Sequence, residues 1–325
     1  MRILFKHIAT IVLSLVLIEL ILRLTGIVQP LWTVVDKDNG KLFKTKENLI
    51  FYNEGFSLTQ SDGNGFVSYD SNKEGAKTLT FYGDSYSEAH QVFYRHHFLH
   101  ALSNKKVPLD CINLSMSDFD FTDSYARYMI FDSILSSDHA YFFLSDDDFD
   151  QDDTDPFIPS VHLENEQLKL SDIDSLSLES SKVKYIAPLL RKSALLYLIR
   201  NAIRQIEMGN SLEILFDGQF TKKVSDEAPD QIISPVVYKI LRNWDRRHCT
   251  IIYRGKRPMS KEYLDILQSY QIPLINLEQE LRKRYNGRYE DLYYHKGTGQ
   301  SGHWNLEAHQ LISTILYEKL NRRFR

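Results

Sequence analysis

The chain has 325 residues, a formal net charge of −4, 43% hydrophobic side chains and 25% charged side chains. These values are ordinary for a globular protein and exclude a disordered or collagen-like chain. The sequence contains no long basic run, so we expect no nucleic-acid partner. Its two cysteines, Cys111 and Cys249, lie in apolar runs outside any CxxC pair, which indicates buried thiols rather than a disulfide scaffold.

The N-terminal segment carries an apolar stretch over residues 8–28 in which Glu19 and Arg23 are the only charged side chains. A helix of this length spans roughly 30 Å, about the thickness of the hydrocarbon core of a bilayer. The two charges stand four residues apart, so they can pair on one helical face. A cleaved signal peptide is the alternative, but its apolar region is shorter and no small-x-small cleavage site follows the stretch. We therefore predict a retained transmembrane helix over residues 8–28.

The charges around this stretch indicate its orientation. Arg2 and Lys6 precede it, and Asp36 and Asp38 follow it closely. The positive-inside rule places such an N-terminus in the cytoplasm. We therefore predict a single-pass membrane protein whose remaining chain is periplasmic or extracellular.

Beyond the apolar stretch, short apolar runs alternate with segments of helical periodicity. The runs predict five strands, at residues 78–82, 109–114, 139–144, 248–253 and 272–277. Near-continuous apolar strands of this kind suit a parallel sheet that is covered on both faces. Helical patterns occupy residues 88–102, 122–135, 233–245, 261–270 and 305–323. The alternation predicts a doubly wound α/β sandwich with a central parallel sheet of about five strands.

A long insertion separates the third and fourth predicted strands and opens with an acidic run. Seven of the ten residues from 146 to 155 are aspartate. An EF-hand calcium loop counted from Asp148 requires Gly at its sixth position and Glu at its twelfth, where the chain has Asp153 and Pro159. We therefore interpret the run as a solvated loop and expect neither a metal nor a cofactor. A long helical pattern follows over residues 188–208.

Candidate chemistry begins where the first predicted strand ends. Ser85 follows Gly83 and Asp84 at a turn from strand to helix. In an open α/β sheet, ligands bind beyond the carboxyl ends of the strands, so this serine faces the expected site. The same residue types also cap helices, so the serine alone is a weak signal. His303, just before the last helical pattern, provides the base that a serine nucleophile requires.

These two blocks resemble those of the SGNH hydrolases, also called the GDSL-like family. Residues 83–87 (Gly-Asp-Ser-Tyr-Ser) match the first block, and residues 302–305 (Gly-His-Trp-Asn) with the later His309 match the last. With the leader at residues 17–24, the chain is similar to membrane-anchored members that acylate or deacylate bacterial cell-envelope polysaccharides. The resemblance implies a three-layer flavodoxin-like fold, with Ser85 as the acyl-accepting nucleophile and His303 as the general base.

The apolar stretch, the pattern of elements and the resemblance together give a domain organisation and a set of partners. They predict a cytoplasmic tail at 1–7, a transmembrane helix at 8–28, a linker and pre-domain segment at 29–75, and an SGNH hydrolase-like domain at 76–325 with an insertion at about 146–230. The expected partners are an acylated polysaccharide or other ester substrate, and the membrane through the N-terminal helix. The sequence leaves the oligomeric state open.

Three positions depart from the family pattern. The second block has Ser115 or Asp118 where a glycine amide normally points to the oxyanion, although any backbone amide can serve there. Asp147 replaces an asparagine that donates to the oxyanion, and a carboxylate only accepts hydrogen bonds. Ser301 stands where the triad aspartate is expected. By the resemblance, the oxyanion hole comprises Ser85, Asp118 and Asp147, and Ser301 orients the histidine.

Two classes of function follow from these residues. Retention of Ser85 and His303 favours serine-dependent ester hydrolysis or O-acyl (acetyl) transfer on a cell-envelope polysaccharide. Asp147 and Ser301 favour a degenerate, non-catalytic SGNH domain that binds glycan or scaffolds an envelope-polysaccharide complex. Hydrolysis and transfer differ only in whether water or a sugar hydroxyl accepts the acyl group, and the sequence does not distinguish them.

Overall fold

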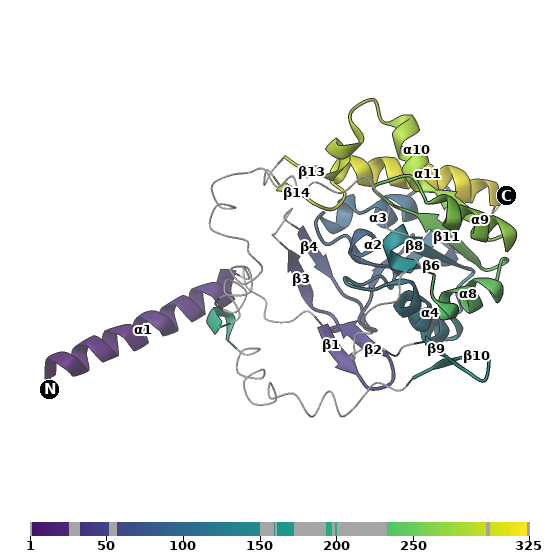
Figure 1. The fold of residues 1–325 in the computed structure, drawn as a ribbon. Helices are drawn as coiled ribbons and strands as arrows, with labels where there is room; N and C mark the ends of the chain where they lie inside the picture. The colour runs from purple at the N-terminus through teal and green to yellow at the C-terminus, as the bar shows by residue number, and fades with distance from the viewer. Residues whose placement is uncertain are drawn as a thin grey trace. The chain divides into compact units, whose positions relative to one another are not determined.

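The computed structural model of the chain describes residues 2–25, 33–51, 57–149, 159, 161–171, 193–196, 199, 233–296 and 300–323 (Figure 1). The chain divides into two compact units. One comprises Met1–Val34 and Ser175–Lys222, and the other comprises Val35–Asp174 and Lys223–Arg325. The second unit contains the central sheet and every candidate site residue.

The smaller unit contains helix α1 (Arg2–Thr25). Its stretch Phe5–Arg23 has a mean hydropathy of 2.1 and 0% of it is buried, so the helix is long and apolar enough to cross a membrane. A signal sequence meets the same criteria. Glu19 pairs with Arg23 at 2.7 Å, which confirms the predicted pairing. The Glu19 carboxylate also accepts hydrogen bonds from residues 193–195.

The larger unit is built around a sheet that, within the described residues, has six strands in the order β12-β11-β8-β6-β7-β5. Five of them run parallel: β6 (Lys77–Gly83), β7 (Leu109–Asn113), β8 (His139–Leu144), β11 (Cys249–Tyr253) and β12 (Leu274–Asn276). Numbered along the chain, these five lie in the order 2-1-3-4-5, which is the flavodoxin-like arrangement. The predicted α/β fold is therefore confirmed, and all five predicted strands lie in this sheet.

The sequence did not predict the antiparallel edge strand β5 (Val67–Tyr69), which pairs with β7. This strand lies in the segment before residue 76. The described residues also form four two-stranded sheets: β1 (Thr33–Asp36) with β2 (Gly40–Phe43), β3 (Asn48–Phe51) with β4 (Ser57–Gln60), β9 (Val161–Glu164) with β10 (Gln167–Leu170), and β13 (Tyr294–His295) with β14 (Gln300–Ser301).

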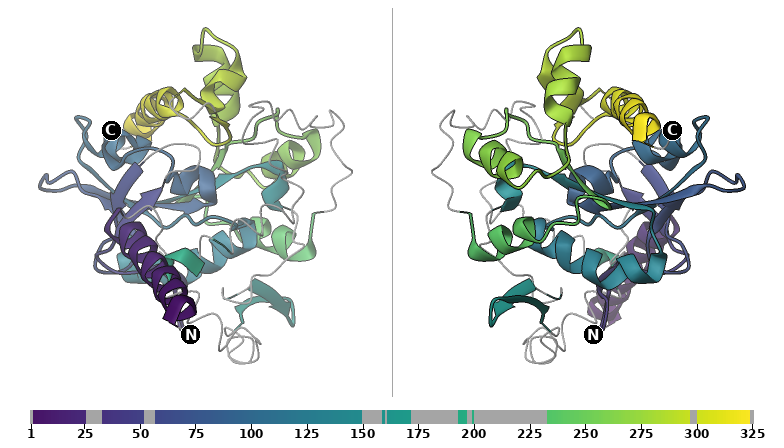
Figure 2. Two further views of the ribbon diagram at one scale, coloured as in Figure 1. Left: turned by 90° about the vertical axis from the view of Figure 1, so that its left-hand side faces the viewer. Right: turned by 90° about the vertical axis from the view of Figure 1, so that its right-hand side faces the viewer.

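Helices cover both faces of the main sheet, as Figure 2 shows for α4 and α11 on opposite sides. The first face carries α4 (Phe121–Leu135), α8 (Pro235–Arg242) and α9 (Lys261–Ser269). The second face carries α3 (Phe98–Ser103), α10 (Leu277–Arg284) and α11 (Leu306–Arg323). Helices on both faces bury both sides of each central strand, which explains the continuous apolar runs.

Aromatic side chains of the central strands pack between the sheet and the helices on each face. On one face, Tyr82 stacks on Phe142 at 5.1 Å and meets Tyr128 of α4. On the other face, Phe143 meets Phe98 of α3 at 5.2 Å. Successive residues of a strand point to opposite faces, so each strand contributes to both layers. Every residue of β8 is consequently buried.

The prediction of one continuous helix over residues 88–102 is wrong. The chain instead forms the one-turn helix α2 (Ser85–Glu88), the 3₁₀ turn η1 (Tyr94–His96) and α3. Ala89 adopts a left-handed conformation with φ 52° and ends α2. A left-handed residue of this kind commonly terminates a helix. The other four predicted helices are present, and α10 is an additional one.

Some predictions fall wholly or partly outside the described residues. These are the end of the apolar span at 26–28, the acidic run beyond residue 149, and most of the helix over 188–208. Within the last of these, residues 194–196 and 199 are helical.

Candidate active site

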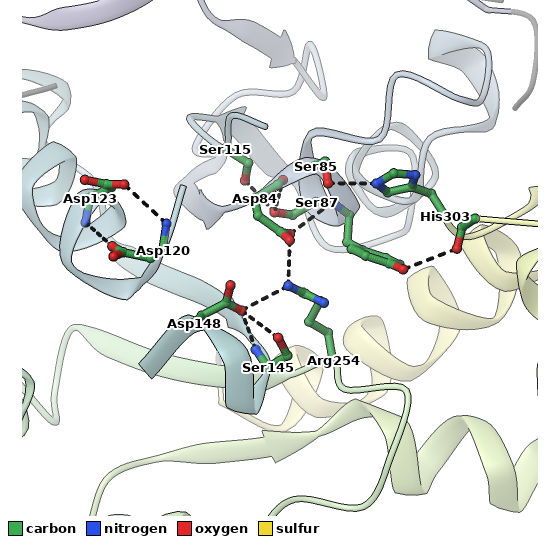
Figure 3. A network of polar contacts seen from close by, with 12 residues as sticks. Asp84, Ser85, Ser87, Ser115, Asp120, Asp123, Ser145, Asp148, Arg254 and His303 are labelled. Carbon is green, nitrogen blue, oxygen red and sulfur yellow. Dashed lines mark hydrogen bonds and ion pairs between the residues drawn. The ribbon is translucent and has the colours of Figure 1, made fainter. Parts of the chain in front are cut away.

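Ser85 and His303 meet at the carboxyl edge of the sheet. Ser85 is the first residue of α2, directly after β6, and His303 lies between β14 and α11. The His303 Nε2 atom lies 2.7 Å from Ser85 Oγ (Figure 3). Both residues are partly exposed. The fold thus joins two residues far apart in sequence in the geometry of a nucleophile and its base.

The turn that presents Ser85 depends on its two preceding residues. Gly83 has φ 147°, and a Cβ atom there would lie 2.7 Å from the carbonyl oxygen of Phe143 and 2.6 Å from Ser87 Oγ. Only glycine fits so close an approach. Asp84 is the N-cap of α2, because its Oδ1 accepts a hydrogen bond from the Tyr86 amide at 3.0 Å. Ser85 itself therefore does not serve as the cap.

A buried arginine joins the ends of three neighbouring strands beside this turn. Arg254 directly follows β11, and its Nη2 lies 2.5 Å from Asp84 Oδ2 and 3.0 Å from Asp148 Oδ2 (Figure 3). Asp148 follows β8 and also accepts hydrogen bonds from the amide and hydroxyl of Ser145. Strands β6 and β8 flank the point where the strand order reverses, which is where ligands bind in such sheets.

Burial and charge act in opposite directions on this cluster. Burial raises the pKa of the Asp84 carboxyl to about 6, against the lowering effect of the Arg254 guanidinium. Burial lowers the pKa of Arg254, but the carboxylates of Asp148 and Asp84 more than offset this and raise it above its ordinary value. The guanidinium is therefore permanently charged.

Tyr86 connects the arginine to the histidine. Its ring centroid lies 4.4 Å from the Arg254 guanidinium carbon and 4.5 Å from the centroid of the His303 ring. Its phenol donates a hydrogen bond to the Gly302 carbonyl at 3.2 Å. The residue after Ser85 is thus in contact with the segment that carries His303.

The second block lies against α2. Ser115 is buried, and its hydroxyl lies 2.7 Å from Ser87 Oγ. Asp118 is exposed and adopts φ 71°, the left-handed conformation that glycine favours. The amides of Ser85 and Asp118 donate hydrogen bonds to no other described residue. Asp118, rather than Ser115, has the backbone conformation expected at a glycine position.

The remaining two predicted site residues lie elsewhere. Asp147 is exposed on the 3₁₀ turn η2 (Asp146–Phe149), and its neighbour Asp148 points into the site instead. Ser301 is exposed in β14, where it pairs with Tyr294 of β13. The contacts of the described residues join neither side chain to the Ser85–His303 pair. Their assigned roles remain predictions.

Sequence reasoning did not single out Arg254 or the inward-pointing role of Asp148. A signal for Arg254 was available, because it is the first residue after an apolar run at the carboxyl end of a predicted strand. No such signal identified Asp148 among its aspartate neighbours. Among the described residues, no group of three or more His, Cys, Asp or Glu side chains could hold a metal ion.

Comparisons with known proteins give fold likenesses only. No protein-family profile and no curated protein matches the chain. The psychrotrophic esterase EstA from Pseudoalteromonas sp. is 12% identical, with 76% of this chain and 98% of that chain covered and a TM-score of 0.36. A member of the lipolytic protein G-D-S-L family from Veillonella parvula is 10% identical, with 76% of this chain and 100% of that chain covered and a TM-score of 0.31.

A third similar structure is a mutant of Axe2, an acetyl-xylooligosaccharide esterase from Geobacillus Stearmophilus. It is 10% identical, with 76% of this chain and 95% of that chain covered and a TM-score of 0.36. Likenesses at this level add no argument of their own. The fold assignment therefore rests on the strand order of this chain.

Proposed function

We propose that this chain is an SGNH-type serine esterase or O-acyl (acetyl) transferase that acts on a cell-envelope polysaccharide. Ser85 is the nucleophile and His303 is the general base. The observation that carries the proposal is the 2.7 Å hydrogen bond between Ser85 Oγ and His303 Nε2 at the carboxyl edge of the sheet. The nucleophile and base are already within hydrogen-bond reach, as this chemistry requires.

The reaction proceeds in two halves. His303 Nε2 takes the proton from Ser85 Oγ as that oxygen attacks the acyl carbonyl and forms a tetrahedral intermediate. The imidazolium then gives the proton to the departing sugar oxygen, which leaves an acyl-serine. In the second half, His303 Nε2 takes the proton of water, which gives hydrolysis, or of a sugar hydroxyl, which gives transfer, as that oxygen attacks the acyl-serine carbonyl. The bond from the acyl carbon to Ser85 Oγ then breaks, and the imidazolium returns the proton to Ser85 Oγ.

Backbone amides provide the oxyanion hole in this proposal. The amides of Ser85 and Asp118 are free of other described partners, and Asp118 holds the left-handed conformation of a glycine position. The family pattern assigns a third donor to the position of Asp147, whose carboxylate cannot donate. Losing one such donor lowers kcat by roughly 10²–10³ in a serine protease. We therefore expect slow turnover of simple esters.

The substrate and location follow from the N-terminal helix and the resemblance of the sequence blocks. Helix α1 is long and apolar enough to anchor the chain in a membrane. With Arg2 and Lys6 in the first two turns of the helix, we propose a cytoplasmic N-terminus and a periplasmic or extracellular catalytic domain. This location gives the enzyme access to envelope polysaccharide.

A non-catalytic glycan-binding or scaffolding role is the second candidate. The observation that favours it is the exposure of Ser301 and Asp147, the two positions where the family pattern has a triad aspartate and an oxyanion donor. A degenerate domain of this type would retain the fold without turnover. The two candidates differ in whether Ser85 reacts with an ester.

The decisive experiment treats detergent-solubilised full-length protein with a fluorophosphonate probe and with p-nitrophenyl acetate. The esterase proposal expects a burst of nitrophenol and probe attachment at Ser85, both lost in Ser85→Ala. The control is Ser269→Ala, which removes a surface hydroxyl that donates a hydrogen bond to the Ile266 carbonyl within α9. Probe attachment at a different residue would show that another nucleophile reacts and overturn the role of Ser85, and no labelling of folded protein would favour the non-catalytic role.

A further inference from the structure

Arg254 occupies an unusual position for an arginine. Its side chain is 8% exposed, and its Nη2 atom bridges Asp84 and Asp148. Each carboxylate is also held by a backbone amide, from Tyr86 and Ser145 respectively. The bridge therefore fixes the chain just after β6, β8 and β11, which are adjacent in the sheet.

Two routes lead from Arg254 to the reacting residues. The first runs through Asp84, which caps α2 immediately before Ser85. The second runs through Tyr86, whose ring covers the guanidinium and whose phenol bonds the carbonyl of Gly302, next to His303. Arg254 touches neither Ser85 nor His303 in the described contacts. It is therefore placed to orient both residues without taking part in the chemistry.

The cluster also has a defined charge. Above the pKa of Asp84, which burial raises to about 6, two carboxylates and one guanidinium sum to a single negative charge. A charged His303 lowers the pKa of Asp84. Two other titratable groups contact the described part of the His303 segment: Tyr86 lies against its ring, and His295 Nε2 lies 3.2 Å from the His303 carbonyl. Lys256 lies farther out, with Nζ 5.7 Å from the Tyr86 ring centroid.

Two other interpretations of Arg254 are weaker. A guanidinium that already binds two carboxylates is compensated, so it does not recruit an anionic substrate. A purely stabilising role is also disfavoured, because a buried ion pair gains little over well-packed apolar residues once its desolvation is included. The Asp84–Arg254–Asp148 bridge lies beside Ser85, because Asp84 is the residue before it. Charge and alignment there affect the proposed reaction.

We propose that Arg254 is a positioning residue which, through Asp84 and Asp148, aligns Ser85 with His303 and leaves one net negative charge to stabilise the protonated histidine. This inference rests on the proposed function. In that role the Asp84–Arg254–Asp148 cluster takes over the electrostatic task of the carboxylate that the family pattern places before the histidine, where this chain has Ser301. A carboxylate near the imidazolium stabilises it as it forms.

The first test is the kinetics of Arg254 variants in the full-length protein. Arg254→Met should lower kcat about 10²-fold with little change in KM, because small misplacements of reacting groups have effects of this size. Arg254→Lys should retain more activity, since it keeps the charge but loses the planar fork. The matched control is Arg284→Met. Arg284 also bridges two carboxylates, those of Glu280 and Glu318, but lies in α10 outside the site.

The second test separates charge from structure. Asp148→Asn changes the net charge of the cluster from −1 to zero, so it should destabilise protonated His303. The acidic limb of the kcat/KM profile should then move to lower pH by about half a unit to one unit. A structural role alone would lower kcat without moving the limb. Thermal unfolding of each variant shows whether it is folded.

Failure of this inference is distinguishable from failure of the proposed function. Wild-type kcat in folded Arg254→Met, or an unmoved acidic limb in Asp148→Asn, overturns the positioning role while the esterase stands. If the wild type does not react with esters, the titration of His303 by NMR of isotope-labelled histidine replaces the kinetic profile. A lower His303 pKa in Asp148→Asn then supports the charge role, and an unchanged value overturns it.

Discussion

The phenol of Tyr86 donates a hydrogen bond to the carbonyl of Gly302 at 3.2 Å, so the residue after the candidate nucleophile is tied to the residue before the candidate base. The two residues are 216 positions apart in the chain. This bond, together with the one between Ser85 and His303, fixes the C-terminal segment against α2. Alignment of the pair therefore depends on a residue that takes no part in proton transfer.

Tyr86→Phe should remove this bond while leaving the ring over Arg254. We expect kcat to fall about tenfold and the free energy of unfolding to fall by about 1 kcal/mol, the usual net value of one hydrogen bond. The pH profile should not move, because no charge changes. Steady-state ester hydrolysis and denaturant unfolding measure these effects. Tyr285→Phe is the control, since its phenol hydrogen-bonds only the exposed Glu307 among the described residues; an equal loss of kcat there would contradict the prediction.

Asp118→Gly should stabilise the protein and raise turnover. The left-handed conformation at φ 71° strains any residue with a Cβ atom, so glycine should add up to about 1 kcal/mol to the free energy of unfolding. The substitution keeps the amide and removes a negative charge from the residue that carries it, so kcat should rise several-fold.

The matched control for Asp118→Gly is Ser136→Gly. Ser136 has φ 48° at the end of α4 and lies outside the candidate site. Both variants should be more stable than the wild type, and only Asp118→Gly should change kcat. A lower kcat in Asp118→Gly would remove Asp118 from the proposed oxyanion hole.

Acid should destabilise the larger unit through its buried histidines. Burial lowers the pKa of His97 to about 3, from an ordinary value near 6.5. Between these values the unfolded chain binds a proton that the folded chain does not, so stability falls as pH decreases through this range. The slope is about 1.4 kcal/mol per pH unit for one such group. Burial also lowers the pKa of His309 well below its ordinary value, which adds to the effect.

His97→Asn tests this account. His97 Nδ1 accepts a hydrogen bond from the Leu99 amide as the N-cap of α3, and asparagine is an equally good cap. The variant should lose less stability than the wild type between pH 7 and about 4.5, as measured by denaturant unfolding at each pH. His162→Asn, an exposed position in β9, should behave as the wild type. An unchanged slope in His97→Asn would show that other groups control acid unfolding.

The full-length chain should remain in the membrane fraction after an alkaline carbonate wash. The reason is the apolar span Phe5–Arg23 of α1, which has the length of a bilayer core. Immunoblotting of the pellet and supernatant gives the measurement. Release into the supernatant, or a mature N-terminus beyond residue 28, would instead identify a peripheral protein or a cleaved signal sequence.

The sequence by itself determined the class of fold and the pair of candidate reacting residues. All six residues of β8 are buried, so the run from His139 to Leu144 had to be apolar throughout and was readable as a central strand. Gly83 and Asp84 were readable for a local reason too, because the turn before Ser85 requires a glycine and a cap within a few residues. Local steric and hydrogen-bonding requirements restrict the residue types at neighbouring positions, so they can be recognised in the sequence.

Only the tertiary structure decided how the site is completed. Asp84, Asp148 and Arg254 lie on three different strand ends and meet because β6, β8 and β11 are neighbours in the sheet. A contact between residues so far apart in sequence produces no local sequence pattern, since each of the three residue types is compatible with its own turn or strand end whatever its partner is. The break after α2 was equally hidden, because the left-handed Ala89 has an ordinary side chain. The ion pairs of a buried site depend on strand order and burial, and these belong to the folded chain as a whole.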